Sequence, residues 1–224
     1  MRTCSRPDWT RELRLARSGC GRVAGLDEVG RGSLAGPVVA AAVVLGRRVR
    51  LPGLNDSKLL TAEERETVLR LILRKAVAWS IGSADAEEID RVNILNATRL
   101  AMSRAVDGLP ERPDHLLLDA IRLPGLAIPQ TDIIGGDRLS VSIAAASIVA
   151  KVARDRLMGH FHHLYPEWGF ATHKGYGTTV HLSAIATHGP SLLHRRTFRG
   201  VLPTAGGISP LKSPAVTAVR TQGV

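Results

Sequence analysis

The sequence predicts an α/β protein, with a mixed sheet flanked by helices and a helical C-terminal portion. Two apolar stretches rich in Val and Ala, at 23–29 and 38–45, come first and predict strands. Segments with helical and strand patterns then alternate, and the pattern is helical from residue 141 onward. The chain has 224 residues, of which 44% are hydrophobic and 22% charged, which is typical of a globular protein with a sizeable core.

The first half of the chain contains the clearest elements. Strands are expected at 23–29 and 38–45, and a third strand at 47–51, ended by Pro-Gly. Thr61 is expected to open a helix, because Glu64 follows three residues later and completes a capping box.

The second half predicts shorter elements. Asn93 is expected to cap a helix that continues to Ala105, after a helical turn at 86–90. The remaining elements, in chain order, are strands at 77–81, 115–119 and 130–134, a helix rich in small residues at 141–157, a surface loop at 161–178 and a helix at 180–188.

The chain ends differ in composition from the middle. Residues 1–20 contain five arginines and predict a basic arm with about one helical turn. Residues 21–203 are expected to form the main domain. Residues 204–224 are rich in small and polar residues without apolar periodicity, which predicts a disordered tail.

Charge and cysteine content narrow the function classes. Lys and Arg total 30 against 20 Asp and Glu, and this net charge of +10 favours a polyanionic partner. A basic surface that serves solubility is the alternative. Cys4 and Cys20 form neither a disulfide framework nor a zinc cluster, which favours a reducing, cytoplasmic location. No apolar run is long enough to cross a bilayer, and no heptad pattern appears, so we expect a monomer without a membrane partner.

Two adjacent acids end the first strand, directly before a glycine turn. Asp27 and Glu28 repel each other and are costly to bury, but a bound divalent cation would offset both the repulsion and the cost of burial. Gly30 and Gly32 allow a ligand to approach the backbone closely, and Arg31 between them carries donors suited to phosphate. The pattern indicates metal-assisted phosphodiester chemistry. An ordinary strand end that leads into a turn is the alternative.

Two further acids occupy comparable positions. Asp119 ends another apolar strand, and Asp137 lies in a glycine turn before the helix rich in small residues. Strand ends of an open α/β sheet converge at one edge, and four carboxylates suit Mg²⁺ or Mn²⁺. The alternatives are that Asp119 begins a turn and that Asp137 caps the following helix. Asp155 is a weaker candidate, because a helix-surface pair with Lys151 explains it.

These motifs, taken together and in order, resemble ribonuclease HII. The resemblance extends from about residue 23 to residue 200 and excludes the arm and the tail. The matching stretches are Gly25–Gly32, Ala35–Val38, Leu54–Lys58, Ile89–Thr98, Leu117–Asp119, Gly136–Asp137, Ile143–Asp155 and His173–Thr178.

The resemblance implies a ribonuclease H-like mixed five-stranded sheet and a catalytic domain at 21–203. It implies an endoribonuclease that hydrolyses the RNA strand of RNA–DNA hybrids and cuts 5′ of single ribonucleotides in duplex DNA. The products would carry 5′-phosphate and 3′-hydroxyl ends. Asp27, Glu28, Asp119 and Asp137 would be the catalytic residues that bind Mn²⁺ or Mg²⁺.

The resemblance also implies a set of substrate contacts. Gly30, Arg31 and Gly32 would contact the ribose 2′-hydroxyl and the scissile phosphate, largely through backbone. Lys58 would bind a phosphate, and Tyr176 would stack on the next sugar. Lys174 is a further substrate candidate, and His173 beside it is a candidate to face the nucleic acid. Solvated surface charges, and a core tyrosine at Tyr176, are the alternatives.

One position departs from the family pattern. Gly135 stands where the family usually has Lys, which puts a local phosphate contact or the entry into the next helix in doubt.

A basic segment near the end of the main domain and two rival functions remain to be considered. Arg195, Arg196 and Arg199 around Phe198 form a basic segment that either contacts phosphates or is simply solvated. A related nuclease acting on DNA junctions or ends, and a hybrid-binding module without catalysis, are the rival functions.

Overall fold

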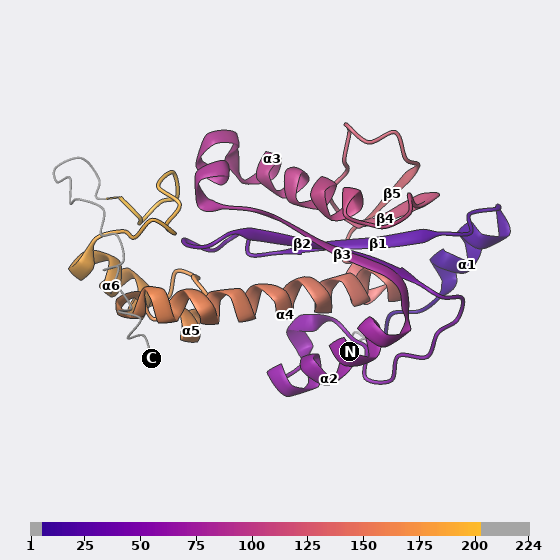
Figure 1. The fold of residues 1–224 in the computed structure, drawn as a ribbon, viewed down its shortest axis with the longest axis horizontal. Coiled ribbons are helices and arrows are strands. Elements are labelled where there is room, and N and C mark those ends of the chain that lie inside the picture. The colour runs from indigo at the N-terminus through magenta and orange to yellow at the C-terminus, as the bar shows by residue number, and fades with distance from the viewer. Residues whose placement is uncertain (1–5, 203–224) are drawn as a thin grey trace, which may run out of the picture.

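The computed structural model describes residues 6–202 and contains a mixed five-stranded sheet flanked by helices (Figure 1). The strand order is β3-β2-β1-β4-β5. β1 runs antiparallel to β2 and parallel to β4, while β2–β3 is antiparallel and β4–β5 parallel. The strands are β1 (Val23–Val29), β2 (Val38–Leu45), β3 (Ala76–Ala84), β4 (His115–Asp119) and β5 (Gln130–Ile133). The predicted fold class is therefore confirmed.

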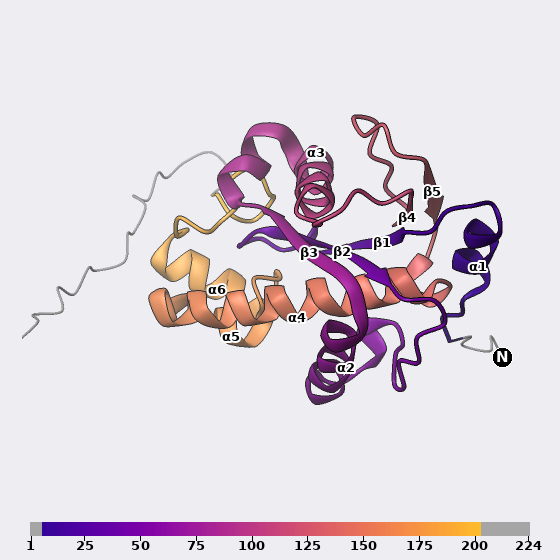
Figure 2. The ribbon, with the colours of Figure 1, turned by 45° about the vertical axis from the view of Figure 1, so that its right-hand side comes forward.

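Helices cover both faces of this sheet. α3 lies on one face, and α4 and α2 lie on the other, while α5 and α6 lie beside the C-terminal end of α4, beyond the sheet (Figures 1 and 2). The helices are α1 (Thr10–Arg17), α2 (Ala62–Lys75), α3 (Ala86–Asp107), α4 (Val141–Leu164), α5 (Phe170–His173) and α6 (Thr179–His188). Short 3-10 turns occur at η1 (Ser57–Leu59), η2 (Gly136–Arg138) and η3 (Pro166–Trp168).

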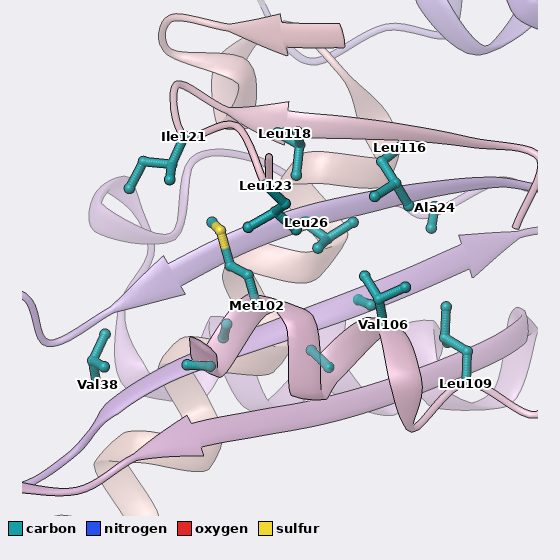
Figure 3. Close-up of a cluster of buried hydrophobic side chains, with 14 of the residues drawn as sticks. Ala24, Leu26, Val38, Met102, Val106, Leu109, Leu116, Leu118, Ile121 and Leu123 are labelled. Carbon is teal, nitrogen blue, oxygen red and sulfur yellow. The ribbon is translucent and has the colours of Figure 1, made fainter. Parts of the chain in front are cut away.

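Alternation along β1 decides which face each acid occupies. Ala24 and Leu26 point into the core beneath α3, where they meet Leu116 and Leu118 of β4 and Met102 of α3 (Figure 3). Because successive strand residues point to opposite faces, Asp27 lies on the other face, against α4. The sequence thus places one carboxylate beneath a helix otherwise packed with apolar and small side chains.

The start of α4 lies directly on β1 at a glycine. A Cβ on Gly25 would lie 2.1 Å from the carbonyl carbon of Ser142, so only glycine permits this approach. This contact brings η2, which precedes α4 in the chain, close to the end of β1.

Two predicted helix starts are confirmed. Thr61 and Glu64 form the reciprocal capping box of α2. Asn93 has a φ of 67° inside α3, which is kinked there, and its side chain accepts a hydrogen bond from Asn96 N at 3.1 Å. Asn93 therefore caps the second part of α3.

Two predicted elements are wrong, and α4 extends to Leu164 instead of ending at residue 157. Residues 47–51 form no strand: Arg47 and Arg48 lie in an exposed turn, with Arg48 at a φ of 53°, and irregular chain follows, in which Leu51 is half-buried. The loop predicted at 161–178 contains the end of α4, η3 and α5, and its Trp168 and Phe170 are buried. Aromatic side chains from non-adjacent segments pack together there, and no local periodicity reveals such a cluster.

The chain ends are only partly described. α1 has eight residues, which is longer than the single turn expected for residues 1–20. The tail predicted at 204–224 lies outside the described residues. Within residues 6–202, no helix combines the length and apolar character needed to span a bilayer.

Candidate active site

Three of the four predicted acids meet at the end of β1. One carboxylate oxygen from each of Asp27, Asp119 and Asp137 lies within 4.8 Å of the other two. The pairing of Leu26 with Leu118 places Asp27 and Asp119 side by side on neighbouring parallel strands. Asp137 comes from η2, where the Gly136 N–H donates to Asp119 Oδ1 at 2.9 Å. Two strand ends and one turn thus build a single acidic cluster.

Glu28 lies next to this cluster and outside it. Arg31 Nη1 donates to its Oε1 at 3.3 Å, and its Oε2 is buried with no hydrogen-bond partner among residues 6–202. Burial raises the pKa of Glu28, and the charge of Asp119 adds to that rise. Glu28 is therefore close enough to interact with the acidic cluster.

The cluster is short of positive charge. Burial raises the pKa of Asp27 well above its usual range, and the charges of Glu28 and Asp119 raise it further. Burial also raises the pKa of Asp137, although Lys58 opposes the rise. Hard divalent cations prefer carboxylate oxygens. Such a cation would offset the repulsion among the carboxylates and would give the buried Glu28 Oε2 a partner. The donor set fits Mg²⁺ or Mn²⁺.

Two basic side chains lie beside Asp137. Lys58 Nζ is 3.3 Å from its Oδ2 and Arg138 Nε is 4.0 Å from its Oδ1. Gly135 has a φ of 68°, and a Cβ there would lie 2.7 Å from Arg138 Nη2. The Arg138 side chain therefore fills the space beside Gly135, the position at which the resemblance led us to expect Lys. Ser140, not Asp137, caps α4.

Arg195 holds the loop that contains Gly30, Arg31 and Gly32, called the glycine loop below, by hydrogen bonds to its carbonyls. Its fully buried guanidinium donates to the carbonyls of Gly30, Arg31 and Gly36 at 2.7–3.0 Å. In a trans peptide the next N–H points opposite to the carbonyl, so the N–H groups of Arg31 and Gly32 point away from Arg195. The suggestion that Arg195 contacts phosphates is wrong, because its donors are used inside the protein. Burial lowers its pKa to about 9, which leaves it charged at neutral pH.

Arg154 of α4 performs a similar task beside it. It is fully buried and donates to the carbonyls of Pro37, Ala35 and Lys174 at 2.9–3.1 Å. In the described part of the chain, neither buried arginine has a carboxylate within 4.0 Å. Two positive charges thus lie under the loop without a local counterion.

Tyr176 lies next to the glycine loop. Ser33 and Tyr176 form an antiparallel bridge, and Leu34 N donates to Gly175 O at 2.8 Å. The Tyr176 side chain is 37% exposed, and the Arg154 guanidinium lies 5.6 Å from its ring centre. The nearby Lys174 is partly buried, and its Nζ donates to Ala171 O at 2.8 Å.

Three histidines hold the Tyr176 turn in place. Ser191 N donates to His194 Nδ1 at 2.9 Å, so the His194 proton is on Nε2, which donates to His181 Nε2 at 3.0 Å. The His181 proton is then on Nδ1, which donates to Tyr176 O at 2.9 Å. His173 stacks on His181 and accepts from Gly175 N. His173 is buried, so the suggestion that it faces nucleic acid is wrong.

This arrangement predicts a loss of stability in acid. Burial lowers the pKa of His181 to about 4 and that of His194 to about 3. The unfolded chain takes up these protons near pH 6.5, before the folded chain does, so stability falls as the pH drops from about 6.5 toward 4. Between pH 8 and pH 5 we expect the free energy of unfolding to fall by about 1–2 kcal/mol for each histidine. Urea unfolding at both pH values measures this fall, and His194→Gln should reduce it while exposed His160→Gln should not.

Sequence reasoning missed Asp90, which links α3 to the Arg195 segment. It accepts hydrogen bonds from Arg196 N, Thr197 N and Thr197 Oγ1 at 2.6–3.0 Å. Asp90 lies in the stretch Ile89–Thr98, which the sequence analysis singled out. No rule of sequence spacing, however, predicts that its side chain hydrogen-bonds residues 196 and 197. The predicted pair of Lys151 with Asp155 is confirmed at 2.7 Å.

Comparisons with known proteins agree with this geometry. The family model described as Ribonuclease HII matches residues 24–201. The chain is 57% identical over 190 residues to Ribonuclease HII of Desulfitobacterium hafniense, covering 85% of this chain and 73% of that protein. It is 54% identical over 193 residues to Ribonuclease HII of Geobacter sulfurreducens, covering 86% and 89%.

A solved structure supports the same assignment. The crystal structure of the ribonuclease H2 from Pyrococcus horikoshii superposes with a TM-score of 0.69 at 25% identity, covering 80% of this chain and 95% of that one. Matches in sequence and in fold extend over most of the chain, so the chain belongs to the ribonuclease HII family of hydrolytic nucleases.

Proposed function

We propose that this protein is a divalent-metal-dependent endoribonuclease. It hydrolyses the RNA strand of RNA–DNA hybrids and cuts 5′ of a single ribonucleotide in duplex DNA, leaving 5′-phosphate and 3′-hydroxyl ends. The observation that carries the proposal is the convergence of Asp27, Asp119 and Asp137 within 4.8 Å, beside a loop with outward-pointing N–H groups.

The acids hold the cation and do little proton chemistry. Asp27, Asp119 and Asp137 bind Mg²⁺ or Mn²⁺, and Glu28 completes the set. A divalent ion held by these carboxylates would supply the chemistry of water activation and of charge stabilisation at the leaving oxygen. Lys58 pairs with Asp137 and opposes the rise of the Asp137 pKa that burial causes. Partial burial lowers the pKa of Lys58, but the charges of Asp137 and Asp56 raise it overall.

The glycine loop and the Tyr176 turn recognise the substrate. The N–H groups of Arg31 and Gly32 donate to the ribose 2′-hydroxyl and the scissile phosphate. Gly30, which has a φ of 93°, shapes the loop from within, because a Cβ there would overlap the Arg154 guanidinium. The 2′-hydroxyl is the group that marks RNA at a given site, so backbone N–H groups that donate to it distinguish a ribonucleotide from a deoxyribonucleotide. Tyr176 packs on the neighbouring deoxyribose. Lys58 and Lys174 bind phosphates, in keeping with the net charge of +10.

The test is cleavage of a DNA duplex that contains one ribonucleotide. With Mn²⁺ or Mg²⁺ we expect one cut, 5′ of the ribonucleotide, and none after chelation of the metal. The same duplex with deoxyribose or 2′-O-methylribose at that position is the control and should stay intact. Equal cutting of the all-DNA control would point to a junction nuclease, and metal-independent binding without turnover would point to a binding module.

A further inference from the structure

α1 lies outside residues 24–201, which the family model matches, yet it is joined closely to the acidic cluster. Glu12 of α1 is only 6% exposed. Its Oε1 accepts hydrogen bonds from Ser140 Oγ at 2.6 Å and from Ser142 N at 2.9 Å. A carboxylate is therefore buried against the first turn of α4.

The residues around Glu12 add to this contact. Arg11 Nη1 donates to Leu139 O at 2.7 Å, and Val141 N donates to Asp8 O at 3.3 Å. Together with the Glu12 contacts, these bonds tie each of the residues 139–142 to residues 8–12. The segment that looked like a basic arm is thus packed against the start of α4.

A physical reason explains why a charge is tolerated there. The N-terminal end of a helix carries a partial positive charge, and α4 has 24 residues. Ser140 caps this helix by accepting from Ile143 N at 3.2 Å while its hydroxyl donates to Glu12. Glu12 therefore holds the capping residue in a single orientation.

The same capping residue is joined to the turn that carries Asp137. Ser140 N donates to Gly136 O at 2.8 Å, and Gly136 N donates to Asp119 Oδ1 at 2.9 Å. Asp137 thus lies in a turn that is held by Asp119 on one side and, through Ser140, by Glu12 on the other.

We infer that Glu12 is a positioning residue for the metal site, holding the Asp137 turn in the geometry that binds the cation. This inference rests on the proposed metal-dependent function. It assigns residues 8–12, which were predicted to form a basic arm, a role in metal affinity.

The test measures Mn²⁺ binding by isothermal titration calorimetry without nucleic acid, on the full-length chain. Glu12→Ala should weaken Mn²⁺ binding about tenfold, which corresponds to about 1.4 kcal/mol. Glu12→Gln keeps an acceptor oxygen and should restore affinity to within about threefold of the wild type, or about 0.7 kcal/mol. Glu63→Ala, an exposed acid in the first turn of α2, is the matched control and should change nothing.

A kinetic measurement separates positioning from general destabilisation. In Glu12→Ala, the Mn²⁺ concentration for half-maximal cleavage should rise about tenfold, while the KM for the duplex stays within twofold. Wild-type Mn²⁺ affinity in Glu12→Ala would overturn the inference even if the variant melts at a lower temperature. If Glu12→Ala does not fold, Ser140→Ala removes the hydroxyl that donates to Glu12 and should weaken Mn²⁺ binding in the same measurement; unchanged affinity there would overturn the inference. Because the calorimetry needs no cleavage, failure of the proposed ribonuclease activity would be recognised separately.

Discussion

Asp27→Asn is expected to reduce cleavage by at least about a thousandfold, equivalent to about 4 kcal/mol, while hybrid binding stays measurable. Asp27 contributes an oxygen to the acidic cluster, and an amide is a much poorer ligand for a hard cation. The same change should raise the melting temperature in metal-free buffer at neutral pH. Burial and neighbouring charges raise the pKa of Asp27, so its ionised form destabilises the folded chain, and a neutral Asn removes this cost.

Asp155→Asn is the matched control for this prediction. Asp155 is an acid on α4 that pairs with Lys151, outside the acidic cluster. The Asp155→Asn substitution should leave the cleavage rate within a few-fold of the wild-type rate. Full turnover in Asp27→Asn would remove Asp27 from the metal site and with it the proposed mechanism.

Arg195→Ala is expected to lower the free energy of unfolding by about 3–5 kcal/mol, because it leaves buried carbonyls without donors and opens a cavity. The carbonyls of Arg31 and Gly36 lose the guanidinium donors, and the Gly30 carbonyl keeps only the Ser33 N–H at 3.3 Å. Urea unfolding measures the loss. Cleavage should also fall at temperatures where the variant is folded, since the N–H groups of the glycine loop lose their fixed orientation.

Arg196→Ala tests whether the effect belongs to burial or to charge. Arg196 is exposed and carries the same charge one residue later, so its removal should cost less than about 0.5 kcal/mol. Arg195→Lys should not restore stability, because an ammonium cannot reproduce the planar fork of donors. Equal effects of Arg195→Ala and Arg196→Ala would contradict the role given to the buried guanidinium.

The sequence predicted five strands of the sheet and three acids of the cluster from local patterns, although it also predicted a strand at 47–51 that does not form and placed Glu28 in the cluster. An apolar run that ends in an acid predicts a buried strand and places the acid at the end of that strand, as Asp27 and Asp119 show. Local capping rules also predicted the helix start at Thr61 and the helix cap at Asn93, which the structure places at a kink inside α3.

The supporting residues could not be predicted in this way. Arg195 and Glu12 are charged residues in polar surroundings, where solvent exposure is the normal expectation. Their burial depends on carbonyls and N–H groups of segments more than a hundred residues away. The histidines around Tyr176 follow the same rule, because each of them hydrogen-bonds a turn or a partner whose position is set only by tertiary packing.

The parallel pairing of β1 with β4 has a consequence for the timing of activity. Val23 pairs with His115, and Asp137 joins the two strands only when α4 has docked on Gly25. Contacts between segments so distant in the chain form late, because the intervening polymer must first be ordered. A nascent chain that has emerged from the ribosome only as far as β4 therefore carries Asp27 and Glu28 without their partners. The acidic cluster is therefore completed only after the turn that carries Asp137 and the start of α4 have been synthesised and have packed on β1.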